Sequence, residues 1–200
     1  FRTVALDAVL ARAQAAGATL LHAPAPLEEP GGGTAAMLRS PEGFVIRLVQ
    51  GDAPRMPDAT PRADVPERLA HVNLNCRDVD ASACFFEEGL GFALSDRSKL
   101  MAFERCNAEH HAVVLAEAPM DGLNHVAFTM AGWEAVMRAS GRMVDAGFPI
   151  GWGPGRHGPG DNVFSYFVDP FGFVLEYTAE VEQVGEDHVA RGPAHWTWPP

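Results

Sequence analysis

The sequence predicts an α+β protein built from repeated units, each of which combines a helix with several strands. Residues 6–17 and 133–147 both read as helices that end at a glycine. At nearly the same distance behind each helix, SPEGFVIRL at residues 40–48 aligns with DPFGFVLEY at residues 169–177. Because helix and strands recur in the same order, the chain contains copies of one unit.

Composition narrows the class of protein before any motif is considered. The 200 residues are 47% hydrophobic and 20% charged, enough for one large or two small domains with real cores. A net charge of −11 argues against a nucleic-acid partner, and the apolar runs are shorter than the roughly 20 residues that cross a membrane. Cys76, Cys84 and Cys106 lack CxxC spacing, so we expect neither disulfides nor a zinc ribbon, and we expect a cytoplasmic protein.

A linker divides the chain, because residues 51–66 contain four prolines among small and charged neighbours. We place this linker at residues 53–68. A third and a fourth copy of the unit follow it. The third has an alternating strand at 71–76, a helix from Asp80 to about 89–91, and strands near 100–105 and 112–116; the fourth starts at 125–130 and ends at Glu176.

The last two strands of the fourth copy are joined by Asp169-Pro170-Phe171-Gly172. Proline presets φ at the second position of a type I turn, and aspartate at the first position accepts a backbone hydrogen bond. The turn predicts a hairpin in which Tyr166 lies opposite Glu176.

Three side chains with metal-binding groups occupy equivalent or facing strand positions. His71 and His125 begin the first strands of the third and fourth copies, and Glu176 lies in the last strand of the fourth. Two imidazoles and one carboxylate facing one cavity would leave metal positions open, as suits Fe(II) that handles oxygen, or Mn(II). Alternatively, each histidine is a satisfied core or surface residue and Glu176 an exposed edge residue. Burying an unpaired glutamate is costly, which favours the metal. Arg47 stands in the first copy where Glu176 stands in the fourth.

These residues resemble the C-terminal half of a type I extradiol ring-cleaving catechol dioxygenase of the vicinal oxygen chelate superfamily. The resemblance extends from Phe1 to about Tyr177 and implies βαβββ modules, paired to form a curved mixed sheet around a metal cavity. It implies that residues 1–52 are the incomplete second module of an N-terminal metal-free domain. Residues 69–180 would form a catalytic domain of two modules, followed by a tail at 181–200. The family's metal ligands carry over onto His71, His125 and Glu176.

Further residues match the family's reactive positions. The resemblance implies that His111 is the acid/base histidine, and that His157 and Tyr166 belong to the signature Arg-His-Gly…Tyr…Asp-Pro-x-Gly…Glu. A nearby asparagine of the family binds substrate, and here Asp161 and Asn162 both compete for that role. Solvated loop histidines and a core tyrosine are the alternative interpretations of the first three.

The resemblance implies extradiol cleavage of a catechol with Fe(II), or Mn(II), and both atoms of O2, giving a muconic semialdehyde-type product. The implied partners are a small aromatic diol and a second copy of the chain, without nucleic acid or membrane. Two alternatives remain open. One is another metal-dependent enzyme of the superfamily, of glyoxalase or lyase type, and the other is a metal-free ligand-binding protein of the bleomycin-resistance type.

Overall fold

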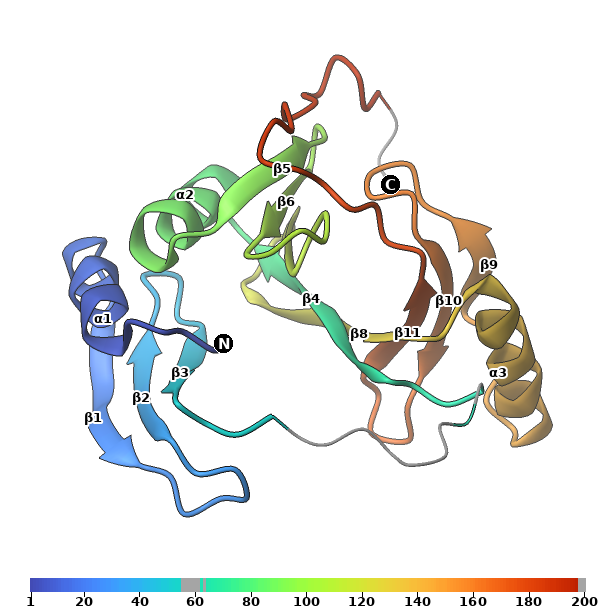
Figure 1. Cartoon of the computed structure of the whole chain (residues 1–200). Helices are drawn as coiled ribbons and strands as arrows, with labels where there is room; N and C mark the ends of the chain where they lie inside the picture. The colour runs from blue at the N-terminus through green and yellow to red at the C-terminus, as the bar shows by residue number, and fades with distance from the viewer. Residues whose placement is uncertain (55–61, 63, 198–200) are drawn as a thin grey trace. The chain divides into compact units, whose positions relative to one another are not determined.

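A computed structural model of the chain describes residues 1–54, 62 and 64–197 (Figure 1). These residues form two compact units. The first contains the described residues of Phe1–Pro61 together with Asp80–Phe92, and the second contains those of Arg62–Val79 and Ala93–Pro200. Within the described ranges, no helix is both long enough and apolar enough to cross a membrane.

The first unit is an antiparallel sheet in the order β1-β2-β3, with helices that pack on each other. Its elements are α1 (Leu6–Ala15), β1 (Thr19–Pro26), β2 (Thr34–Arg39) and β3 (Val45–Gln50), to which α2 (Val79–Cys84) and the π-helix η1 (Phe85–Leu90) are added. Helix α1 followed by three strands is the predicted first copy of the repeat. The helix predicted from Asp80 is observed as α2 and η1, and it ends at Gly91 with a φ of 81°.

Segment 80–92 groups with the first unit because its apolar side chains pack on the N-terminal residues. The Phe1 ring meets the rings of Phe86 and Phe92 edge to face, at centroid distances of 6.5 and 5.2 Å. Gly89 lets the helices approach closely, since a Cβ there would lie 3.3 Å from that of Ala16. The domain ranges predicted from the sequence stay a prediction, and this packing adds segment 80–92 to the N-terminal group.

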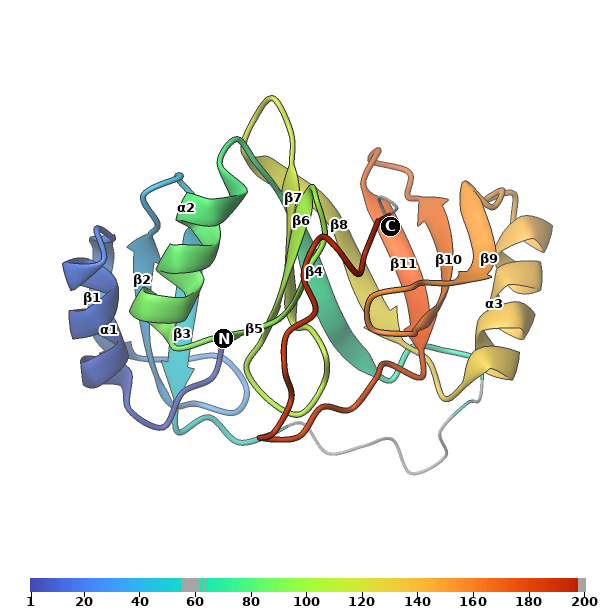
Figure 2. The ribbon, with the colours of Figure 1, turned by 90° about the horizontal axis from the view of Figure 1, so that it is seen from above.

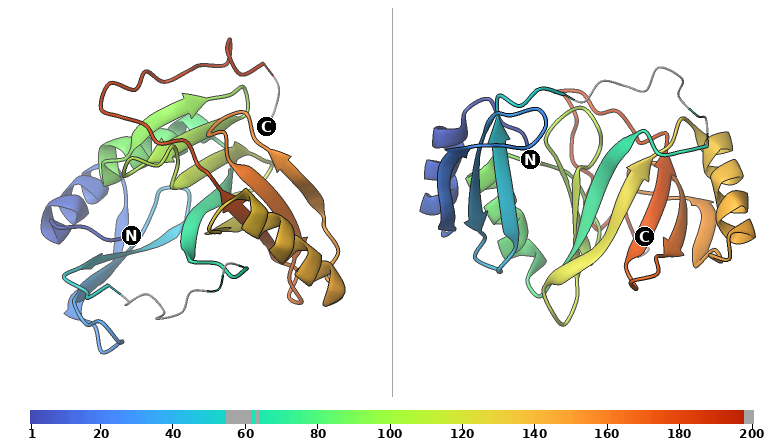
Figure 3. Two further views of the ribbon diagram at one scale, coloured as in Figure 1. Left: turned by 45° about the vertical axis from the view of Figure 1, so that its right-hand side comes forward. Right: turned by 90° about the horizontal axis from the view of Figure 1, so that it is seen from below.

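The second unit is built on one mixed sheet in the order β5-β6-β7-β4-β8-β11-β10-β9. Its strands are β4 (Arg68–Cys76), β5 (Ala93–Arg97), β6 (Met101–Arg105), β7 (Val113–Glu117), β8 (Gly122–Thr129), β9 (Trp152–Arg156), β10 (Val163–Val168) and β11 (Val174–Ala179), and its helix is α3 (Trp133–Asp145). Each half has a parallel pair, β4 with β7 and β8 with β11. Antiparallel β4 and β8 join the halves, side by side at the centre (Figure 3). The predicted βαβββ repeat and mixed sheet are confirmed.

The symmetry of the two halves is broken at one pair of positions. The sequence predicts His71 and His125 as the first residues of their strands, but each is the fourth residue of its strand. In each half, the residue that follows the histidine has a partner on the parallel neighbour. The residue that follows this partner is Val114 in the half that carries His71, and it is Glu176 in the half that carries His125. One carboxylate and one valine at equivalent positions leave the sheet with a single acidic group beside its two histidines.

Helix α3 covers β10 and β11 on one face of the sheet (Figure 2). The apolar side chains of this contact are buried and form one cluster, consisting of Met130, Ala135, Val136, Ala139, Val163 and Ala179, with Tyr177 packed against them. Strand side chains alternate between faces. The side chains of β10 and β11 that pack against α3 therefore lie on one face of the sheet. The alternate side chains, which include Glu176, lie on the opposite face.

The hairpin formed by β10 and β11 has the predicted register. Tyr166 pairs with Glu176, and the Asp169 carboxylate accepts hydrogen bonds from the backbone N–H groups of Phe171 and Phe173, both at 2.8 Å. The side-chain cap fixes the turn, and because a shift of one residue would turn every side chain to the other face, the turn also fixes which face Glu176 occupies.

The corresponding turn in the first unit supports the internal repeat. Gly43 and Gly172 both donate their N–H to the carbonyl three residues earlier, at 3.0 Å, and their φ angles are 102° and 90°. Arg47, which aligns with Glu176, instead forms an exposed ion pair with Glu29 at 2.7 Å.

The described part of the C-terminal tail lies against the second unit. The backbone N–H of Arg97 donates to the carbonyl of Arg191, at 2.8 Å. Glu182 accepts from the N–H of His110 and donates to the carbonyl of Gly160, both at 2.8 Å, so it joins two loops of different modules. The described part of the tail is therefore an integral part of the folded second unit.

Candidate metal centre and substrate cavity

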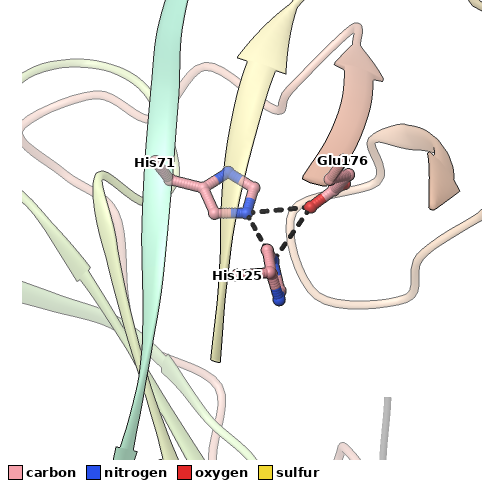
Figure 4. A group of neighbouring side chains, drawn as sticks. All are labelled: His71, His125 and Glu176. Carbon is pink, nitrogen blue, oxygen red and sulfur yellow. Dashed lines mark hydrogen bonds and ion pairs between the residues drawn. The ribbon is translucent and has the colours of Figure 1, made fainter. Parts of the chain in front are cut away.

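Three donor atoms from three strands converge on one point (Figure 4). Both His71 Nε2 on β4 and His125 Nε2 on β8 lie 3.1 Å from Glu176 Oε2 on β11, and 3.4 Å from each other. The three side chains are buried, with exposed fractions of 4%, 6% and 0%. The structure thus brings together the three residues that the sequence predicts as metal ligands.

The hydrogen bonds around His125 fix which of its nitrogens carries the proton. Asn124 Nδ2 donates to Asn75 Oδ1 at 2.8 Å, so Asn124 presents its Oδ1 to His125 Nδ1, 2.9 Å away. That oxygen can only accept, so His125 is protonated on Nδ1 and its Nε2 lone pair faces the other donors. Sequence reasoning missed Asn124, although its position next to a candidate ligand was a usable signal.

The two oxygens of Glu176 have different surroundings. Oε1 accepts a hydrogen bond from Asn162 Nδ2 at 3.3 Å, and Asn162 is held in turn by Thr178 Oγ1 at 2.8 Å. Oε2 is buried and makes no hydrogen bond within the described part of the chain. Burial by itself raises the pKa of Glu176, but the electrostatic influence of the neighbouring His71 and His125 outweighs burial and holds that pKa well below the usual 4.5.

The donor set fits a divalent cation. Donors about 2.1 Å from a metal and at right angles to each other lie about 3.0 Å apart, close to the distances of 3.1 to 3.4 Å found here. A buried carboxylate oxygen without a hydrogen bond, facing imidazole nitrogens, is stabilised when a cation lies between them. His71, His125 and Glu176 could therefore hold one divalent metal with open coordination positions.

A cavity of about 460 Å³ opens beside these donors. It falls in the range of about 300–1,000 Å³ that is usual for small-molecule sites. Further polar side chains line it, among them His111, His157 and Tyr166. Its apolar walls include Met101, Phe103, Val114, Trp152, Phe167 and Val174. A small aromatic ring with polar substituents on one edge matches this arrangement.

His157 and Tyr166 form a hydrogen-bonded pair in the cavity. His157 Nε2 lies 3.1 Å from Tyr166 Oη, and the Tyr166 ring stacks on Trp152. Burial lowers the pKa of His157 from 6.5 to about 4, and burial together with the Glu176 carboxylate raises that of Tyr166 far above its usual 10. At neutral pH the histidine is uncharged and the tyrosine keeps its proton, so the pair can supply hydrogen bonds without adding charge.

The lowered pKa of His157 predicts how stability depends on pH. Between about pH 6.5 and 4 the unfolded chain binds a proton that the folded protein excludes, so the free energy of unfolding falls as the pH falls through this window. The expected loss is on the order of 3 kcal/mol, because the pKa falls by about 2.5 units and each unit corresponds to about 1.4 kcal/mol. Urea unfolding of chelator-treated protein measures it. The slope should be smaller in His157→Gln and unchanged in His22→Gln, a change at an exposed histidine; equal slopes in all three proteins would contradict the assignment.

His111 is buried beside the candidate ligands, with its ring centroid 4.5 Å from that of His71. Its Nδ1 lies 3.0 Å from Nδ1 of His110, which is also buried. Burial, followed by the charges of His71 and His110, holds the pKa of His111 well below 6.5, so it is neutral and able to accept a proton. Neither histidine is the solvated loop residue of the alternative interpretation.

The two candidates for substrate contact have different positions. Asn162 is buried, lines the cavity and bonds Glu176. Asp161 is exposed, does not line the cavity, and has its carboxylate 3.7 Å from Arg156 Nη1. Its φ of 50° lies in the left-handed region, which aspartate and asparagine adopt more readily than other non-glycine residues. The structure brings only Asn162 to the cavity.

Comparison with curated proteins finds relatives named as metapyrocatechases. Metapyrocatechase 2 of Cupriavidus necator is 35% identical over 138 residues, which cover 68% of this chain and 41% of that protein. The metapyrocatechase of Pseudomonas sp. strain CF600 is 31% identical over 112 residues, 52% of this chain and 36% of that protein. The chain thus spans about two fifths of the length of these relatives.

Solved structures share the fold. The Mn(II)-bound glyoxalase of Novosphingobium aromaticivorans is 39% identical, with a TM-score of 0.88 over 93% of this chain and 62% of that chain. The 2,3-dioxygenase LapB of Pseudomonas sp. KL28 has a TM-score of 0.82 over 95% of this chain and 73% of that chain; at 24% identity this likeness concerns the fold alone. The sequence profile of one family matches residues 68–177, more than half of the chain. The chain belongs to the Glyoxalase/Bleomycin resistance protein/Dioxygenase superfamily.

Proposed function

We propose that this protein cleaves the ring of a catechol-type diol in the extradiol position, using one divalent metal held by His71, His125 and Glu176 and both atoms of O2. The observation that carries the proposal is the convergence of these donors, 3.1 to 3.4 Å apart, at the edge of an apolar cavity. The names of the metapyrocatechase relatives support it.

Fe(II) is the proposed metal, because two histidines and one carboxylate are the set used by non-haem iron oxygenases. Mn(II) suits the same donors, and the solved relative that is 39% identical holds Mn(II). When bound, the metal would act as a Lewis acid that favours loss of a proton from the catechol and would offer positions for the diol and for O2.

The remaining polar residues of the cavity handle protons and orient the substrate. Neutral His111 accepts a proton from a substrate hydroxyl and can return it later. Tyr166 keeps its proton and donates a hydrogen bond, and His157 fixes the position of that hydroxyl. Apolar walls such as Phe103 and Trp152 bind the ring and keep water out.

A second candidate function is a glyoxalase or lyase reaction on the same metal, favoured by the name of the solved relative from Novosphingobium aromaticivorans. Such chemistry needs a metal but not O2, and gives no reason for His111, His157 and Tyr166 to line one cavity. A metal-free binding protein is less consistent with the buried carboxylate oxygen that lacks a hydrogen bond.

One experiment separates these functions. The protein is loaded with Fe(II) without air, mixed with a panel of substituted catechols, exposed to O2, and followed by oxygen uptake and by the yellow colour of the ring-opened product. We expect one molecule of coloured product for each molecule of O2 that is consumed. A protein that holds stoichiometric iron, consumes no oxygen, and isomerises the glutathione adduct of methylglyoxal would contradict ring cleavage and support the second candidate. Binding of catechol without any divalent metal would support a metal-free ligand-binding protein.

Removal of the Asn162 amide is expected to weaken metal binding. Asn162 holds Oε1 of Glu176, and partners of this kind are typically worth about 10–100-fold in metal affinity. Asn162→Ala should therefore raise the dissociation constant for Fe(II) or Mn(II) by about this factor, as measured by competition with a chelating dye. Asp161→Asn is the matched control, since it changes the exposed neighbour and asparagine tolerates the positive φ. Equal affinities in both variants would rule out the role of Asn162.

The wider setting of the site also remains a proposal. We propose that residues 69–180 act as the catalytic domain, that the protein works in the cytoplasm, and that it forms a homo-oligomer. Sedimentation analysis of the purified protein tests the last point, with a monomer as the contrary result.

A further inference from the structure

A chain of three buried polar side chains leads from the C-terminal tail to the cavity. Asp96 Oδ2 lies 3.1 Å from His110 Nε2, and His110 Nδ1 lies 3.0 Å from His111 Nδ1. Asp96 and His110 are fully buried and neither lines the cavity. The proposed function uses His111 but gives no role to the two residues behind it.

The surroundings of Asp96 require it to be a charged carboxylate. Oδ1 accepts from the backbone N–H of Arg191 at 2.8 Å and from its Nε at 3.2 Å, and Oδ2 accepts from Trp196 Nε1 at 3.0 Å. The Arg191 guanidinium also lies 2.9 Å from Oδ2. All of these groups can only donate, so a proton on Asp96 would meet a donor. Burial raises its pKa, but the hydrogen bonds from Arg191 and His110 outweigh burial and lower it.

A charged Asp96 determines which ring nitrogen carries the proton in His110 and in His111. Facing a carboxylate, His110 must carry its proton on Nε2, because the carboxylate only accepts. Burial lowers the pKa of His110 below 6.5, an effect that Asp96 only partly offsets, so the ring is neutral and its Nδ1 is a lone pair. His111 must then donate from Nδ1, which leaves its own lone pair on Nε2.

We propose that Asp96 and His110 are positioning residues that hold His111 in the Nδ1–H tautomer, so that Nε2 is the atom that takes the substrate proton. This inference rests on the proposed function of His111. When Nε2 gains the proton, the positive charge of the ring is stabilised through His110 by the Asp96 carboxylate, without any of the three residues leaving its place.

The groups packed around His110 and His111 hold their contact in place and exclude water from it. A Cβ on Gly160 would lie 2.9 Å from His111 Cε1 and 3.1 Å from His110 Nδ1, so the backbone of Gly160 covers the contact closely. Its φ of 81° also favours glycine. On another side, the Phe103 ring lies 5.7 Å from both imidazole rings. Glu182 of the tail bonds both His110 N–H and the Gly160 carbonyl, which ties these walls together.

Replacement of Asp96 by asparagine tests the proposal with little change of shape. Arg191 donates twice to Oδ1, so the asparagine oxygen would stay there and its NH2 would face His110 Nε2 in place of Oδ2, with loss of the hydrogen bond that Oδ2 accepts from Trp196 Nε1. His110 would then carry its proton on Nδ1 and donate to His111, whose proton would move to Nε2. In the Ser-His-Asp triad the same change of tautomer lowers kcat by about 10⁴ with the geometry intact.

The first measurement is the tautomer itself, read from the ¹⁵N chemical shifts of the ring nitrogens in histidine-labelled protein loaded with diamagnetic Zn(II), and again after chelation. His111→Gln identifies the His111 signals. We expect a protonated Nδ1 and a bare Nε2 at His111 in the wild type, and the reverse in Asp96→Asn. A protonated Nε2 in the wild type would overturn the proposal whether or not the protein cleaves catechols.

The second measurement is kinetic. Asp96→Asn should lower kcat for ring cleavage by at least about 10²-fold, the lower end of what general base catalysis contributes, with KM and metal content close to wild type. Glu182→Gln is the matched control, because it loosens the tail at Arg191 without touching Asp96. Equal losses in both variants would indicate a structural role and overturn the proposal. A wild type without ring cleavage but with the expected tautomer would overturn only the proposed function.

Discussion

Glu176→Gln is expected to abolish both metal binding and ring cleavage. Glutamine keeps the shape, but it has no charge to balance a divalent cation and presents an NH2 group or a weaker oxygen to His71 and His125, which lie 3.1 Å from Oε2. The loss of metal affinity should exceed about 10–100-fold, which is the typical loss when a residue that hydrogen-bonds a metal ligand is replaced. Metal content per chain after anaerobic Fe(II) loading and gel filtration measures it.

The matched control for this change is Glu134→Gln, at an exposed glutamate on α3 that pairs with Arg138. It should bind metal and turn over like the wild type. Full metal content and activity in Glu176→Gln would show that the converging donors are not the metal site.

His111→Asn is expected to lower kcat by about 10²–10⁴-fold while the protein still binds metal and catechol. The reason is that His111 is the buried, neutral imidazole beside the candidate metal ligands that hydrogen-bonds none of them. Stopped-flow measurement of the single-turnover rate separates this chemical step from binding. His195→Asn, at an exposed histidine of the tail, provides the control. An unchanged rate in His111→Asn would move the proton acceptor to another group, with His157 the next candidate.

Local rules in the sequence were enough to predict which side chains converge at the candidate site. The turn at Asp169 is specified by its own residues, and it alone determines that Tyr166 pairs with Glu176. The repeat places His71 and His125 at equivalent positions, the fourth residue of β4 and of β8, and both side chains line the same cavity. Turn chemistry and period-two alternation act over a few residues, so they can be read without knowing the rest of the fold.

Features that depend on contacts between distant segments could not be predicted in this way. Asp96 bonds Arg191 and Trp196, 95 and 100 residues further along the chain, and no local pattern marks that pairing. The edge strands β5 and β9 were not identified, because β5 contains charged residues and β9 contains glycine and proline. The packing of η1 on α1 depends in the same way on a distant partner.

The uncertainty between Asp161 and Asn162 had a different origin. The positive φ at Asp161 breaks the alternation of side chains just before β10, so no periodic rule could say which of the two faces the cavity. Among the aromatic residues near these loops, Trp152 lines the cavity, whereas Phe171 is 85% exposed at the tip of a turn.

The most direct test of the proposed chemistry is a single turnover with isotopically labelled oxygen. The Fe(II)-loaded protein is mixed with one equivalent of a substituted catechol without air, exposed to ¹⁸O2, and the product is analysed at once by mass spectrometry. Extradiol cleavage by this site predicts a ring-opened product that carries both labelled atoms, formed by the wild type and by Glu134→Gln but not by Glu176→Gln. A product without label, or no product from protein that holds its full complement of iron, would contradict it.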